Sequence, residues 1–427
     1  MMKQRKNTLF LMRPLNHVRV VFFALLICLS HGCSHAEKKT QSRPLTDPQD
    51  WPMWVEIGPD TTLTARAIVE ADRCPTIKID AQEISMDTRA PAEAGRYPVL
   101  TCEKILPATT THASISGRAL PLPKKDLTKI VVIGDTGCRI AGKGSDTRVQ
   151  ACNDPTKWTF PVVAKAIADA QPDLVIHVGD YLYREVPCPA DQPGCAKSPS
   201  GDRWATWDAD FFSPADPLLR VAPWIFVRGN HELCARAGAG WFRFLDARAL
   251  SQACSDETPP YLVHTGDHGP EFLITDSAPG PLTQKSLAAL AELSPHHAWL
   301  FTHRPIWFPS AKGKPDLSMG PHLIPPHGID LVFAGHVHSF RIIDFKKPRV
   351  PEIIAGNSGT QLTPLDDALA AEFTKNKMPV RSVCGENDFG FLTLERSAPL
   401  KNTKWKVFET PLASLENHTL SSCRLEY

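Results

Sequence analysis

The chain has 427 residues, of which 42% are hydrophobic, so it can bury a large core, and its length predicts roughly two or three domains. Its 47 lysine and arginine residues nearly balance its 46 aspartate and glutamate residues. This near-neutral charge, without any basic run interleaved with aromatic residues, gives no electrostatic reason to expect nucleic acid as a partner.

The first 36 residues have the pattern of an export signal. Basic residues precede an apolar run at positions 20–29, which is too short to span a bilayer comfortably but suits the core of a signal peptide. Cleavage after Ala36 is one expectation. The other is a bacterial lipoprotein signal that ends at residue 32, because Leu29–Cys33 resembles a lipoprotein box with Ser30 at a position that usually carries leucine.

The mature protein is therefore expected to be exported, as a periplasmic, outer-membrane-anchored or secreted protein. A lipid on Cys33 would attach it to a membrane, and plain cleavage would leave it free. The polar residues 37–50 are typical of a linker.

The cysteine count agrees with export. The chain has twelve cysteines, and removal of Cys28 and Cys33 leaves ten, an even number for a chain that folds in an oxidising compartment. Because short loops close most readily, we expect five disulfides between cysteines that are neighbours in sequence. The expected pairs are Cys74–Cys102, Cys138–Cys152, Cys188–Cys195, Cys234–Cys254 and Cys384–Cys423. The absence of any Cys-x-x-Cys sequence argues against a cysteine-rich zinc site.

Residues 51–125 contain short extended-looking pieces separated by proline, glycine and aspartate. Strand-sized segments with turn signals between them predict a small N-terminal β-sandwich domain. The sequence Pro-Leu-Pro-Lys-Lys at 121–125 predicts a stiff connection to a second domain, which would span residues 126–427.

From Lys129 onward, apolar strand-like runs alternate with helical patterns, which predicts an α/β core whose strands deliver polar groups at their carboxyl ends. Five of these runs end in segments that carry metal-binding residue types. The segments are Gly134-Asp135-Thr136-Gly137, Gly179-Asp180-Tyr181-Leu182-Tyr183, Gly229-Asn230-His231-Glu232, Thr302-His303-Arg304-Pro305 and Gly335-His336-Val337-His338.

The last of these segments has two histidines at positions i and i+2. In an extended chain both imidazoles would point to one spot, which favours a cation between them. One such pair is weak evidence, and a Gly-Asp pair after a strand can be a simple turn. Here five such segments each follow an apolar strand. A separate simple explanation would have to hold for every one of them at once, so these explanations account poorly for the pattern.

The order and residue types of the five segments resemble the calcineurin-like metallophosphoesterase superfamily, whose blocks are Gly-Asp, Gly-Asp, Gly-Asn-His, a lone His and Gly-His-x-His. The resemblance covers roughly residues 129–357 and implies a four-layered α/β/β/α sandwich and a metal-dependent phosphoric ester hydrolase. Gly137 stands where many members carry a histidine, and Tyr183 follows Asp180 at the spacing of the tyrosine ligand in purple acid phosphatases. The chain therefore looks like the purple acid phosphatase branch.

The resemblance implies two metal ions that share one carboxylate. One ion would take Asp135, Asp180, Tyr183 and His338, and the other would take Asp180, Asn230, His303 and His336. The anionic donors of the first set suit ferric iron, whereas the imidazoles and the amide oxygen of the second set suit a divalent ion such as Fe, Zn or Mn.

The resemblance also places His231 beside the phosphate without making it a ligand. There it would stabilise the phosphoryl oxygens or protonate the leaving group. Arg304 and Arg139 are candidates for a phosphate-binding fork, with an ordinary ion pair as the alternative. His322 and His327 lie in the span where purple acid phosphatases carry a further histidine, although a surface-loop position is the simpler interpretation for both.

The expected function is hydrolysis of a small phosphorylated substrate, a phosphate monoester, by attack of a metal hydroxide. A phosphodiesterase or nucleotidase of the same fold is an alternative, since nothing in the sequence supplies or excludes a base-reading pocket. A non-catalytic surface lipoprotein is a further alternative. It would be expected to lack some ligands, whereas all seven expected ligand positions are filled here.

Overall fold

A computed structural model describes residues 44–427, except for 143–147, 252, 267–268, 309–321, 365–368, 401–402 and 418–422. The expected signal peptide, Cys33 and the first part of the expected linker lie outside the described residues. Within the part that is described, no helix is long and apolar enough to cross a membrane.

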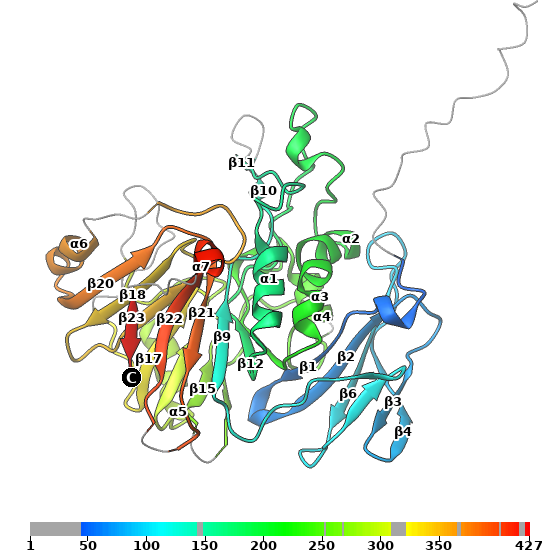
Figure 1. The fold of residues 1–427 in the computed structure, drawn as a ribbon, viewed down its shortest axis with the longest axis horizontal. Coiled ribbons are helices and arrows are strands. Elements are labelled where there is room, and N and C mark those ends of the chain that lie inside the picture. Colours follow the sequence, from blue (N-terminus) through cyan, green and yellow to red (C-terminus); the bar gives the residue numbers. More distant parts are fainter. Residues whose placement is uncertain are drawn as a thin grey trace, which may run out of the picture. The chain divides into compact units, whose positions relative to one another are not determined.

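Two large sheets form the centre of the fold (Figure 1). The ten-stranded sheet contains, in spatial order, β23 (Arg424–Glu426), β22 (Lys406–Pro411), β21 (Gly390–Glu395), β9 (Lys129–Ile133), β12 (Leu174–His177), β13 (Trp224–Phe226), β1 (Met53–Ile57), β2 (Leu63–Val69), β6 (Leu100–Leu106) and β5 (Asp87–Ala90). The seven-stranded sheet contains β14 (Tyr261–Val263), β15 (Glu271–Ile274), β16 (Ala298–Phe301), β17 (Ile329–Ala334), β19 (Glu352–Ala355), β18 (Phe340–Phe345) and β20 (Val380–Glu386).

Smaller elements surround these sheets. A four-stranded sheet contains β4 (Gln82–Ser85), β3 (Thr76–Ile79), β7 (Ala113–Ile115) and β8 (Arg118–Ala119), and a hairpin contains β10 (Ile140–Ala141) and β11 (Arg148–Val149). The α-helices are α1 (Phe160–Asp169), α2 (Trp204–Trp207), α3 (Ser213–Leu219), α4 (Gly238–Phe244), α5 (Gln284–Glu292), α6 (Leu369–Lys375) and α7 (Leu412–Asn417). Short 3-10 helices are η1 (Pro48–Asp50), η2 (Pro59–Thr61), η4 (Pro193–Cys195) and η6 (Asn230–Glu232), and η5 (Asp208–Phe212) is a π-helical turn.

The central strands bury alternate side chains on opposite faces. On β9, Val131 belongs to a core shared with α1 and α3, whereas Val132 belongs to a core between the two sheets. On β16, Phe301 faces the inter-sheet core and Leu300 faces a third core shared with α5 and α6. The layers therefore run helix, sheet, sheet, helix, which confirms the α/β/β/α sandwich expected from the resemblance.

Parallel pairing brings the expected site segments to common edges. Strands β9, β12 and β13 are parallel neighbours, and so are β15, β16, β17 and β19 in the other sheet. Because parallel strands end on the same side of a sheet, the segments that follow β9, β12, β13, β16 and β17 meet there.

Residues 51–125 are rich in β-structure, as expected, but their longest strands share a sheet with the strands that lead to the predicted site. Strand β1 pairs in parallel with β13 through Glu56 and Trp224, and β2, β6 and β5 continue the sheet beyond β1. The sequence did not predict this continuity. The domain boundary at residue 125 stays a prediction.

A buried ion pair braces this junction. The guanidinium of Arg66 on β2 lies 2.7 Å from the carboxylate of Glu56 on β1. Arg66 also donates hydrogen bonds to the carbonyl oxygens of Phe244 and Asp246, which lie at the end of α4 and just beyond it. The N-terminal strands therefore hold a segment that leads away from the predicted site.

The five disulfides predicted from sequence neighbours all form in the structure. They are Cys74–Cys102, Cys138–Cys152, Cys188–Cys195, Cys234–Cys254 and Cys384–Cys423. Three of them close loops that leave the strand ends of the predicted site, after β9, β12 and β13.

A buried hydrogen bond joins the two large sheets. The side-chain amide of Asn357, which follows β19, donates to the carboxyl oxygen Oε1 of Glu409 on β22. Both side chains are fully buried. Burial raises the pKa of Glu409 from 4.5 to about 9, so the carboxyl group stays protonated in the folded protein at neutral pH.

We predict that Glu409→Gln makes the free energy of unfolding less dependent on pH. In the wild type the unfolded chain loses this proton near pH 4.5 and the folded chain only near pH 9, so stability falls as the pH rises through this window. Denaturant unfolding at about pH 5 and about pH 8 should show the variant gaining a few kcal/mol relative to the wild type at the higher pH. If the free energies of unfolding of variant and wild type differed by the same amount at both pH values, the raised pKa of Glu409 would be contradicted.

Candidate metal centre

The five expected segments come together at the carboxyl edge of the two sheets. The backbone N–H of Thr136 donates to the carbonyl oxygen of Asp180, and that of Gly335 donates to the carbonyl oxygen of His303. The second and third segments approach each other closely, because a Cβ atom on Gly229 would lie 2.1 Å from the backbone nitrogen of Asp180. Glycine at this position is what allows the second and third segments to touch.

Three of the expected ligands have left-handed backbone conformations. Asp135, Asp180 and His336 have φ values of 55°, 63° and 67°. Such conformations cost on the order of 1 to 3 kcal/mol for residues other than glycine, and they persist at functional sites where the surroundings impose them. Each residue lies just after a strand, so the turn redirects its side chain toward the edge shared by the sheets.

The turn at His336 bears on two expectations for the histidine pair, one shared point from extended geometry and two separate ions from the resemblance. An extended chain would have aimed His336 and His338 at the same point, but the left-handed φ at His336 separates them. His338 Nε2 lies 2.9 Å from the Tyr183 hydroxyl, whereas a ring nitrogen of His336 groups with Asp180 and His303. The two histidines therefore serve two different groups of donors.

The first group contains Asp180, His303 and His336, whose ligand atoms all lie within 4.8 Å of one another. His303 Nε2 is 3.2 Å from Asp180 Oδ2 and 3.0 Å from Asn230 Oδ1. His303 Nδ1 donates to the carbonyl oxygen of Val178 at 2.8 Å, which leaves Nε2 as the nitrogen that faces the group. Two imidazoles, a carboxylate and an amide oxygen are donors that suit a divalent ion.

The electrostatics of the first group also favour a cation. Burial by itself lowers the pKa of His303, but the charge and hydrogen bond of Asp180 outweigh burial and raise the pKa to about 9. A carboxylate that holds a proton on a buried imidazole holds a positive charge at that point. A metal ion would supply positive charge at the same point and take the proton's place.

The second group surrounds the hydroxyl of Tyr183. This oxygen lies 3.0 Å from Asp135 Oδ1, 2.8 Å from Asp180 Oδ2 and 2.9 Å from His338 Nε2. His338 Nδ1 lies 3.0 Å from the carbonyl oxygen of Gln361, which again turns Nε2 toward the other donors. Burial raises the pKa of Tyr183 well above its ordinary value, and Asp135 and Asp180 raise it further.

The structure thus brings all seven expected ligands into two adjoining groups that share Asp180. The donors are two carboxylates, three imidazoles, one phenol and one amide, a set that suits oxygen-loving and borderline metal ions. The role of each residue as a ligand stays a proposal.

His231, Arg304 and Arg139 lie beside these groups. The ring of His231 packs on that of Tyr183 with 3.7 Å between centroids, and its Nε2 is 3.8 Å from Asp180 Oδ2. Arg304 Nη1 donates to His336 Nε2 at 3.0 Å. The Arg139 guanidinium lies 5.8 Å from the centroid of the Tyr183 ring.

His322, His327 and His177 lie outside the two donor groups. His322 and His327 are exposed, and His327 precedes β17, whereas His336 follows the other end of that strand. His177 is buried behind the site, where its Nε2 meets the Thr136 hydroxyl at 2.9 Å and its ring stacks on Tyr181. His177 is therefore a structural residue.

Sequence reasoning missed two buried carboxylates that position the ligand loops. Glu232 accepts backbone hydrogen bonds from Gly229, Asp180, Tyr181 and Leu182. Burial and the nearby charge of Asp180 raise its pKa to about 8. Its position directly after Gly-Asn-His was the only signal available in the sequence.

Asp210 is the other missed carboxylate, and it lies on the π-helical turn η5. It accepts hydrogen bonds from the backbone N–H groups of Cys138, Tyr183 and Arg184 at 3.1, 2.8 and 3.0 Å. One side chain therefore fixes the loops after both β9 and β12. Nothing in the local sequence marks Asp210, because its partners are distant along the chain.

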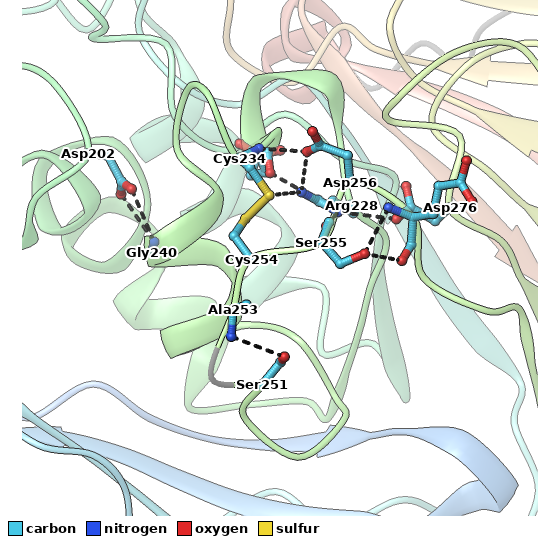
Figure 2. Close-up of a disulfide and its surroundings, with 12 residues drawn as sticks. Asp202, Arg228, Cys234, Gly240, Ser251, Ala253, Cys254, Ser255, Asp256 and Asp276 are labelled. Atoms are coloured by element: carbon cyan, nitrogen blue, oxygen red, sulfur yellow. Dashed lines mark hydrogen bonds and ion pairs between the residues drawn. A yellow bond between two sulfur atoms is a disulfide. The ribbon is translucent and has the colours of Figure 1, made fainter.

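Arg228 holds the third loop through contacts with several segments, some of which Figure 2 shows. Its guanidinium donates to the carbonyl oxygens of Glu232 and Ser255 at 2.9 and 2.6 Å and lies 3.4 Å from the carboxylates of Asp256 and Asp276. Beside the Arg228 guanidinium, the Cys234–Cys254 disulfide joins the chain just after Glu232 to the chain just before Ser255.

Residues 128–340 match the model of the calcineurin-like phosphoesterase family, and the match contains all five segments. This region belongs to the calcineurin-like phosphoesterase family.

Two solved structures have a similar fold. A purple acid phosphatase, PPD1, from yellow lupin (Lupinus luteus) seeds is similar with a TM-score of 0.53 and 15% identity over 88% of this chain and 74% of that one. The structure of PhoD is similar with a TM-score of 0.52 and 11% identity over 90% of each chain. At these identities the likeness shows the fold alone. No curated protein matches this phosphoesterase significantly in sequence.

We predict that Asp180→Asn removes tightly bound metal from the phosphoesterase. Loss of a group that merely orients a ligand lowers metal affinity about 10- to 100-fold, so loss of the shared carboxylate should cost at least about 100-fold. Metal analysis of the purified protein after dialysis measures this. Asp169→Asn, which changes an exposed carboxylate paired with Lys165, is the control and should retain the metal. Equal metal content in both variants would exclude Asp180 as a ligand.

Proposed function

We propose that this protein is an exported phosphomonoesterase that uses two metal ions of the purple acid phosphatase type. The observation that carries the proposal is the pair of donor groups that share Asp180, within a calcineurin-like phosphoesterase region. Asp135, Asp180, Tyr183 and His338 would hold ferric iron, and Asp180, Asn230, His303 and His336 would hold a divalent ion (Fe, Zn or Mn).

When bound, the two ions would lower the pKa of a water molecule and offset the negative charge of the phosphoryl group. The protein's own residues orient the substrate. His231 would direct Nε2 toward the phosphoryl oxygens or the leaving oxygen, and Arg304 and Arg139 would supply positive charge on either side. Arg304 lies on the His336 side and Arg139 on the Tyr183 side, which fits a small phosphorylated substrate between them.

Export is part of the proposal. Five disulfides suit an oxidising compartment, and the pattern of residues 1–36 suits a signal peptide. Lipidation of Cys33 would add membrane attachment. Mass spectrometry of the mature N-terminus distinguishes a lipid on Cys33 from cleavage after Ala36.

The proposed activity is tested with a chromogenic phosphate monoester and the corresponding diester. We expect hydrolysis of the monoester to exceed that of the diester, and His336→Ala and Asn230→Ala to lower it by about 100-fold or more, because each removes a donor to the divalent ion. His297→Ala is the matched control, since His297 lies before the amino end of β16, whereas His303 follows its carboxyl end.

The outcomes separate the alternatives. A preference for the diester would favour the phosphodiesterase or nucleotidase function, and no hydrolysis of either ester would favour a binding protein. Equal activity in wild type, His336→Ala and Asn230→Ala would discard the metal mechanism.

Colour tests the role of Tyr183. If its phenolate binds ferric iron, charge transfer gives the purified protein a visible absorption band, and Tyr183→Phe should lose the band while it keeps the other ligands of the iron. Absorption spectra and iron analysis of both proteins measure this. A colourless wild-type protein that contains stoichiometric iron would count against Tyr183 as a ligand.

A further inference from the structure

His231 is held by groups from the loop that follows β12. Its Nδ1 lies 3.1 Å from Glu185 Oε1 and 3.1 Å from the carbonyl oxygen of Leu182. Both oxygens can accept a hydrogen bond from Nδ1, and Nε2 lies 3.8 Å from Asp180 Oδ2. The backbone N–H of His231 donates to Asp180 Oδ1 at 2.9 Å, which fixes the start of the side chain as well.

Arg236 completes a clamp around this ring. Its Nε donates to Glu185 Oε1 at 2.6 Å, and its Nη2 meets the same oxygen. The same Nη2 lies 2.8 and 2.9 Å from the two ring nitrogens of His231, so the guanidinium lies against the ring. Arg236 Nη1 also donates to the carbonyl oxygen of Asn230.

The clamp is anchored at both ends. The backbone N–H of Glu185 donates to the carbonyl oxygen of Ile140, and that of Arg236 donates to the carbonyl oxygen of Leu233.

We propose that Glu185 and Arg236 are positioning residues that hold the His231 ring with Nε2 directed at the phosphoryl group of the substrate. The proposal rests on the proposed phosphomonoesterase function. Neither residue belongs to the two donor groups, and both act through His231. The Tyr183 ring closes the remaining side, so the imidazole is confined by an aromatic ring, a carboxylate and a guanidinium.

A double-mutant cycle on the metal-loaded enzyme tests this role. His231→Ala should lower kcat by about 100-fold or more, and Glu185→Gln by about 10-fold or more with little change in KM and with unchanged metal content. If Glu185 acts through His231, adding Glu185→Gln to His231→Ala should cost less than about 2-fold further, because residues that act as a unit are not additive. The kcat of Arg236→Lys, which keeps the charge but loses the second nitrogen at Glu185 Oε1, should lie between that of the wild type and that of Arg236→Met.

The control is Asp216→Asn, which breaks a carboxylate–arginine pair with Arg220 on the surface and should leave kcat unchanged. Full additivity of Glu185→Gln and His231→Ala, or loss of metal in Glu185→Gln, would overturn the proposal while leaving the phosphatase function intact. A crystal structure of Glu185→Gln decides the matter independently of activity. We expect the His231 ring to leave its stack on Tyr183, and an unmoved ring would refute the positioning role even if the wild type hydrolysed no phosphate ester.

Discussion

The site depends on one buried charge, the carboxylate of Asp180, which is 1% exposed. Burial raises its pKa, but His303 and His231 outweigh burial and hold the pKa well below its ordinary value. Its Oδ1 accepts the backbone N–H of His231, while Oδ2 meets the Tyr183 hydroxyl and His303 Nε2. A charge in such a place is tolerated only when donors or cations surround it, so the loops from both sheets must converge on it.

Convergence of this kind needs a rigid support. Left-handed turns at three of the proposed ligands cost free energy, and Glu232, Asp210 and Arg228 offset that cost by satisfying backbone groups of the loops that carry the proposed ligands. Strands β2 and β5 near the N-terminus also stabilise a neighbouring segment through hydrogen bonds. Arg66 and Arg89 donate to the carbonyl oxygens of residues 242–246, the segment that follows the loop of His231 and Arg236.

The sequence predicted what local patterns encode. Apolar strands that end in Gly-Asp or Gly-His located the site, since parallel strands buried on both faces appear as continuous apolar runs. Neighbouring cysteines predicted the disulfides. The pairing of β1 with β13 escaped prediction because it joins segments far apart in the chain, and Asp210 escaped because its partners are equally distant. The divergence of His336 and His338 depends on one backbone angle, which residue spacing does not reveal.

The central claim is that two ions share the Asp180 carboxylate, and anomalous X-ray diffraction of crystals of the metal-loaded protein tests it most directly. Two anomalous peaks about 3.5 to 4 Å apart are predicted, with Asp180 between them, Tyr183 and His338 on one peak, and His303 and His336 on the other. A single peak, or two peaks that do not share Asp180, would contradict the account.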